Sequence, residues 1–105
     1  MTDAVVVLVT APSAEVAATI ARAVVEERLA ACGNVLPAVR SIYRWQGKVL
    51  DEAEVLLILK TQRRRFPELR DRILALHPYE VPEVLALPVE AGSDAYLDWI
   101  AQAMY

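Results

Sequence analysis

Two long extended stretches joined by the dipeptide Gln46-Gly47 constrain the fold of this chain more than any other feature of its sequence. Apolar and polar residues alternate up to Trp45, and a return strand runs from Lys48 to Thr61, so the pattern predicts a β-hairpin with a short turn. At about 3.3 Å per residue, each arm of about fourteen residues would span about 45 Å, more than the body of a compact domain of this size. We therefore expect the tip of the hairpin to project or to bend.

The projecting part of this hairpin carries apolar side chains that a lone subunit would leave in water. They are Val39, Ile42, Tyr43, Trp45, Val49 and Leu50. The apolar share of the whole chain, 56%, also lies above the usual level for a soluble globular protein. Both observations predict that a partner chain covers part of the surface. Within the first arm, Pro37 predicts a bulge or an unpaired edge position.

Shorter periodic segments predict the elements on either side of the hairpin. Residues 4–9 form an apolar run typical of a strand buried on both faces, and Ser13 is a suitable N-cap for a helix that should fade near Ala31. After the hairpin, a second helix opens at Arg63-Arg64-Arg65, and Pro78 ends it. An acidic patch at residues 51–54 is expected to interrupt the return strand and to form a solvated face.

The C-terminal part of the chain adds one strand and one helix. Residues 81–89 alternate, with prolines that favour an edge position, and a helix starts after Gly92-Ser93. The order strand, helix, strand, strand, helix, strand, helix predicts an α+β fold, a ferredoxin-like βαββαβ sandwich with an additional C-terminal helix. A length of 105 residues fits one domain, residues 1–105.

Composition excludes several classes of function. The net charge of -3 provides no electrostatic footprint for nucleic acid, and the longest apolar runs fall far short of the roughly 20 residues that cross a bilayer. We therefore expect neither a nucleic-acid nor a membrane partner. The single cysteine cannot form an intrachain disulfide, and the N-terminus lacks the pattern of a secretory signal, so a cytoplasmic location is expected.

The only histidine, His77, fits two roles. At the last turn of a helix its ring is favoured by the helix dipole, which makes it part of a rigid connector before Pro78. Neutral imidazole is also a ligand for copper, nickel and zinc, and Glu80 or Glu83 lies close enough along the chain to supply an oxygen. Because a closed zinc site would need further carboxylates, a metal site here would be open or shared between chains.

Several motifs occur together and in order: ERLAAC at 27–32, SIYRWQGK at 41–48, LKT at 59–61, LHPYEVPE at 76–83 and ALP at 86–88. With them the chain closely resembles the CutA family of divalent-cation-tolerance proteins over nearly its whole length. The resemblance implies a ferredoxin-like subunit in a tight homotrimer, as in the similar PII signalling proteins. It also implies a non-enzymatic, cytoplasmic role in tolerance to divalent cations, copper above all.

The family's ligand-facing groups near the subunit clefts correspond by position to residues of this chain. They are Arg28, Tyr43, Trp45, Lys60, His77, Tyr79 and Glu83. The resemblance implies a metal site at His77 and Glu83. It implies no required cofactor, and Cu²⁺ or another divalent cation as the ion that this site would take. A first-strand cysteine of some relatives is replaced here by Val9, which speaks against a copper-thiolate site at that position.

Two functions remain open on the sequence alone. The first is a homotrimer that binds or responds to divalent metal ions. The alternative is a PII-like signalling module that binds a small anionic ligand at subunit clefts.

Overall fold

The computed structural model describes residues 2–105, which form a four-stranded antiparallel sheet and three α-helices. The elements are β1 (Ala4–Ala11), α1 (Ala14–Glu26), β2 (Cys32–Trp45), β3 (Lys48–Gln62), α2 (Phe66–Leu76), β4 (Leu85–Pro88) and α3 (Asp94–Ala103). The strand order in the sheet is β2-β3-β1-β4. This arrangement confirms the predicted α+β, ferredoxin-like fold with an added C-terminal helix.

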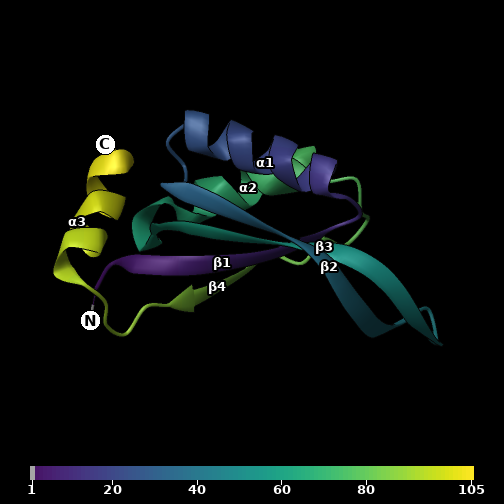
Figure 1. Cartoon of the computed structure of the whole chain (residues 1–105). Helices are drawn as coiled ribbons and strands as arrows, with labels where there is room; N and C mark the ends of the chain where they lie inside the picture. The colour runs from purple at the N-terminus through teal and green to yellow at the C-terminus, as the bar shows by residue number, and fades with distance from the viewer. Residues whose placement is uncertain (1) are drawn as a thin grey trace.

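Helices α1 and α2 cover one face of the sheet, and α3 lies at the end of the sheet near the N-terminus (Figure 1). Alternate residues of the central strands point under α1 and α2, and Val7, Val9, Leu57 and Leu59 have no exposed surface. Each such side chain contributes about 1.5–3 kcal/mol through burial. A smaller cluster around Met104 docks α3 against the start of β1.

The opposite face of the sheet, which we call the open face, carries apolar side chains that α1 and α2 do not cover. The strand registers place on it Val6, Leu8, Leu36, Leu56, Ile58, Leu85 and Leu87. Leu85 and Leu87, on the edge strand β4, are 55% and 48% exposed. A single subunit therefore leaves one layer of its sandwich without a covering layer.

The hairpin of β2 and β3 projects beyond the body of the molecule, as predicted (Figure 1), and the longest dimension reaches 44 Å. Gln46 and Gly47 have φ values of 50° and 79°, which gives the tight two-residue turn typical of hairpins. The pairing of β2 with β3 shifts between Leu36 and Val39, and Ala38 there adopts a φ of 66°. The bulge expected at Pro37 is thus confirmed.

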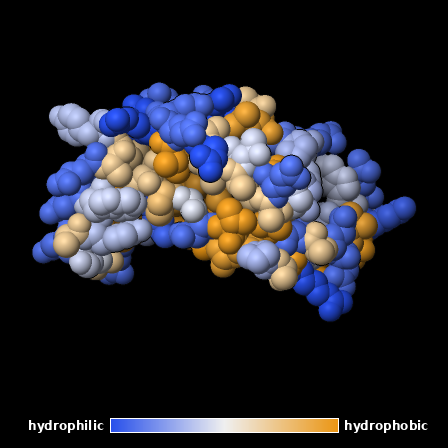
Figure 2. Space-filling view, turned by 45° about the horizontal axis from the view of Figure 1, so that its top comes forward, coloured by the Kyte–Doolittle hydropathy of each residue, from blue (hydrophilic) through white to orange (hydrophobic). Residues whose placement is uncertain are grey.

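Apolar side chains of this projecting arm are exposed. Ile42 and Val49 are 65% and 63% exposed. Figure 2 shows hydrophobic residues reaching the surface along the middle of the molecule, between mainly hydrophilic ends.

The arm also carries an ion pair between Arg40 and Asp51, joined by two hydrogen bonds of 2.9 and 2.7 Å. This pair holds the pKa of the Asp51 carboxyl below its usual value.

Helix α1 is shorter than expected. It ends at Glu26 rather than near Ala31, because Arg28 takes a left-handed φ of 60° and the Leu29 and Ala30 amides turn back to the Val24 carbonyl. Glycine usually occupies such a position, and an arginine there does not signal the end of a helix.

Two strand predictions also need correction. β3 continues without a break through the acidic patch, because residues 51–54 pair with β2 along the arm. The strand expected over 81–89 is reduced to Leu85–Pro88, consistent with Pro82, which cannot donate to a strand ladder. Among residues 2–105, no helix is long and apolar enough to span a membrane.

Candidate ligand-binding cleft

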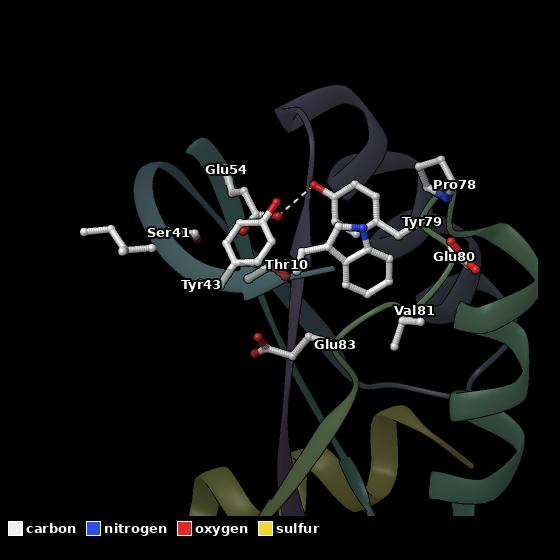
Figure 3. Close-up of a pocket in the computed structure, with 11 residues that line it drawn as sticks. Thr10, Ser41, Tyr43, Glu54, Pro78, Tyr79, Glu80, Val81 and Glu83 are labelled. Carbon is white, nitrogen blue, oxygen red and sulfur yellow. Dashed lines mark hydrogen bonds between the residues drawn. The ribbon is translucent and has the colours of Figure 1, made fainter. Parts of the chain in front are cut away.

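A cleft of about 670 Å³ lies between the projecting hairpin arm, the end of β1 and the segment after α2. It is lined by Thr10, Ser41, Ile42, Tyr43, Trp45, Glu54, Pro78, Tyr79, Glu80, Val81 and Glu83. In Figure 3, the side chains of Tyr43, Glu54 and Tyr79 lie close together, and Glu83, from the same segment as Tyr79, lies apart from these three. The projecting hairpin thus supplies one wall, and the proline-rich segment 78–83 supplies the other.

His77 fixes the second wall to the sheet. Its ring, in a residue only 8% exposed, places Nε2 2.7 Å from the Thr10 carbonyl, and Nδ1 accepts the Tyr79 backbone N–H at 3.1 Å. Because Nδ1 receives a hydrogen bond and Nε2 faces a carbonyl, Nε2 carries the proton. Both ring nitrogens are therefore engaged in this conformation. A metal ion on the imidazole would have to replace one of these two bonds.

Two tyrosines of the cleft donate to glutamates of β3. The Tyr79 hydroxyl donates to Glu54 Oε2 at 2.7 Å, and burial together with this bond raises the Tyr79 pKa. The Tyr43 hydroxyl donates to Glu52, which raises the Tyr43 pKa to about 12. The interpretation of residues 51–54 as a solvated face is therefore wrong for Glu54, which lines the cleft.

Glu83 is a partly buried carboxylate of the cleft. Burial, and secondly the negative charge of Glu54, raise the pKa of its carboxyl. Within residues 2–105 it has no hydrogen bond or ion pair to stabilise its ionised form. Any cation that entered the cleft would supply the missing opposite charge.

The structure brings together part of the predicted set of site residues. Tyr43, Trp45, Tyr79 and Glu83 all line the cleft, and His77 lies directly behind Tyr79, with their ring centres 4.6 Å apart. The functional role of each of these residues stays a prediction.

The two predicted cationic residues lie outside the cleft lining of this chain. Arg28 donates to the Tyr105 carbonyl, and Lys60 Nζ donates to Asn34 Oδ1 at 2.5 Å. Cys32 is also distant along the sheet, half-buried, with Sγ 3.8 Å from the Tyr96 hydroxyl. In place of the first-strand cysteine, Val9 points into the core with no exposed surface. One subunit therefore offers an acidic cleft and keeps its predicted cationic residues elsewhere.

Sequence reasoning missed Glu52, Glu54 and Thr10 as neighbours of the cleft. Residues two apart in a strand lie on the same face of the sheet, so the sequence alone could have placed Glu52 and Glu54 together on one side of β3. Across the described residues 2–105, no group of three His, Cys, Asp or Glu side chains is arranged to hold a metal ion. The carboxylates of one chain therefore form at most an open site.

The fold and the cleft together define a ferredoxin-like α+β subunit with a projecting hairpin and an acidic, aromatic cleft beside that hairpin. The family model of the CutA1 divalent ion tolerance protein matches residues 5–103, so the chain belongs to this family. The resemblance inferred from the motifs is thereby confirmed.

Relatives from distant organisms support this assignment. A divalent-cation tolerance protein CutA from Thermus thermophilus is 58% identical, over 92% of this chain and 94% of the relative. The crystal structure of CutA from Xylella fastidiosa superimposes with a TM-score of 0.96 at 39% identity, over 99% of this chain and 100% of the other.

Human protein CutA is 54% identical over 90% of this chain, but the chain spans only about half, 52%, of that relative. A further relative, from Arabidopsis thaliana, is named as chloroplastic. Because compartments differ among relatives, a cytoplasmic location stays a prediction for this chain.

Proposed function

We propose that the chain forms a homotrimer that binds divalent cations, copper among them, at the cleft, without catalysing a reaction. The proposal is supported by the family, whose Thermus thermophilus member is named for divalent-cation tolerance. The observation that carries it is the pair of carboxylates, Glu54 and Glu83, facing one cleft whose lining, among residues 2–105, includes no lysine or arginine. Relief of the repulsion between them favours a bound cation.

The metal site of this proposal is open. Glu83, with Glu54, supplies the first contacts, and water or groups of a second chain complete the coordination. His77 contributes as a ligand only after release of Thr10 or of the Tyr79 amide, and otherwise as the residue that positions Tyr79. Oxygen ligands bind many divalent ions, so selectivity for copper depends on that imidazole.

The test is calorimetric titration of the whole protein with Cu²⁺, Zn²⁺ and Mg²⁺. We expect saturable binding that Glu83→Gln weakens, while the exposed control Glu90→Gln leaves it unchanged. Adding His77→Asn shows whether preference for Cu²⁺ over Mg²⁺ depends on the imidazole. Equal binding by the wild type and Glu83→Gln would remove the site from this cleft. Saturable ATP binding without any metal response would favour the PII-like alternative instead.

The proposed trimer follows from surfaces that a lone subunit leaves uncovered. The open face exposes Leu85 and Leu87, the arm exposes Ile42 and Val49, and both β2 and β4 are edge strands with unpaired backbone groups. The number of subunits, three, comes from the resemblance. Light scattering should give three times the subunit mass of 11.6 kDa. Leu87→Glu should shift the protein towards smaller species, and a monomeric wild type would contradict the proposal.

A further inference from the structure

The cleft is larger than a metal ion requires. Its volume of about 670 Å³ falls within the range of about 300–1,000 Å³ that is usual for organic ligands. A divalent ion bound by Glu54 and Glu83 would leave most of that space, and all of the aromatic surface, unused. The size of the cleft therefore indicates a ligand with several carbon atoms.

The lining specifies the charge of that ligand. Three aromatic side chains, Tyr43, Trp45 and Tyr79, line the cleft together with the carboxylates of Glu54, Glu80 and Glu83. The cleft lining within residues 2–105 includes no lysine or arginine. Aromatic faces and carboxylates both attract cations.

Hydrogen bonds hold two of these rings in place before any ligand arrives. Tyr79 is tied through its hydroxyl to Glu54 and through its backbone to His77, and Tyr43 is tied to Glu52. A phenol that donates to a carboxylate gains electron density in its ring, which strengthens its attraction for a cation. Rings fixed in this way lose little entropy on binding.

Apolar surface is also present for a hydrocarbon stem. Pro78 and Val81 line the same cleft. Glu83, which has no hydrogen bond or ion pair within residues 2–105, is left to meet the charged head group. The cleft thus combines one site for positive charge, three rings and an apolar wall.

We propose that this cleft binds a small organic cation, an ammonium group on a short hydrocarbon stem, with the cation against Glu83 and the rings of Tyr43, Trp45 and Tyr79. This inference goes beyond the proposed binding of divalent ions, because it assigns a ligand to the aromatic surface. Organic and metal cations would share Glu83, so each should displace the other.

The test follows Trp45 fluorescence in the full-length Trp99→Phe protein, in which Trp45 is the only tryptophan. The probes are butylammonium chloride, tetramethylammonium chloride and butan-1-ol, at ionic strength held constant with sodium chloride. We expect saturable binding of both ammonium ions, and affinity at least about tenfold lower for butan-1-ol, which has the same stem without the charge. Equal affinity for butylammonium and butan-1-ol, or no saturable response to either ammonium ion, would overturn the inference.

Variants separate the rings from the charge. Tyr43→Leu, which keeps an apolar side chain but removes the ring, should weaken tetramethylammonium binding about three- to tenfold. Glu83→Gln should weaken it further, whereas Tyr96→Leu on α3, outside the cleft, should leave it unchanged. Equal losses in Tyr43→Leu and Tyr96→Leu would show that the aromatic wall takes no part.

A parallel Cu²⁺ titration of the same wild-type protein distinguishes this inference from the proposed function. Metal binding without ammonium binding defeats the organic-cation inference alone. Ammonium binding without metal binding defeats the proposed metal function alone.

Discussion

Replacing His77 by alanine tests whether the imidazole is chiefly a support for the cleft wall or a metal ligand. The change removes the bond to the Thr10 carbonyl and the acceptor of the Tyr79 amide. Two such bonds, at about 0.5–1.5 kcal/mol each, amount to about 1–3 kcal/mol, and lost packing of a nearly buried ring adds about 1 kcal/mol. We therefore expect the free energy of unfolding to fall by about 2–4 kcal/mol.

The assay is urea denaturation of metal-free protein at one fixed subunit concentration, because the stability of an oligomer depends on concentration. The control is His77→Asn, whose side-chain oxygen accepts from the amide two residues on and so restores one bond. It should recover about 1 kcal/mol of the loss. If His77→Ala unfolds at the wild-type urea concentration, the supporting role is refuted. Loss of Cu²⁺ affinity at unchanged stability would identify a ligand instead.

Three further predictions concern Glu83, Gly33 and Thr61. The raised pKa of Glu83 means that the folded state binds a proton more tightly than the unfolded state, so stability of the metal-free protein should rise as pH falls through that pKa. Glu83→Gln should be more stable than the wild type near neutral pH, and its stability should not rise as pH falls. Midpoints of urea denaturation, measured for both proteins at several pH values, test this. A Cβ on Gly33 would lie 3.0 Å from Ala21 Cβ and 3.0 Å from Leu59 Cδ2, so Gly33→Ala should lower the free energy of unfolding by about 1–3 kcal/mol. In the control Gly92→Ala the new Cβ comes no closer than 3.4 Å to a neighbour, so thermal unfolding should be nearly unchanged. Thr61→Val removes the buried hydroxyl that donates to the Leu29 carbonyl at 2.7 Å and should cost about 1–3 kcal/mol in urea denaturation; Thr61→Ser, which keeps the hydroxyl, should cost less.

The fold could be predicted because its signals are local. Ser13 accepts from the Val16 amide as an N-cap should, Pro37 marks the bulge, and Gln46-Gly47 forms the turn. The end of α1 was missed because an arginine, not a glycine, takes the left-handed position.

The cleft was less predictable because its contacts join distant parts of the chain. Thr10 and His77 are 67 positions apart, and Glu54 and Tyr79 are 25 apart. A single sequence shows that His77 precedes a proline, but not which carbonyl its ring will face. Of the four predicted residues that line the cleft, Tyr43, Trp45 and Tyr79 were given a ligand-facing role through the resemblance to the family. Glu83 was also indicated by its closeness to His77 along the chain.

Proline at the sheet edge has a consequence for how copies of this chain meet. β4 pairs with β1 over only four residues, with Pro82 shortly before it and Pro88 as its last residue. Neither proline has an amide hydrogen that could bond to a strand from another subunit. A strand that adds to β4 can therefore pair with it over only a few residues, between two fixed ends. So short an edge strand permits few alternative registers. This limits non-specific aggregation through the exposed edge that carries Leu85 and Leu87, but it still allows a second subunit to pair in one register.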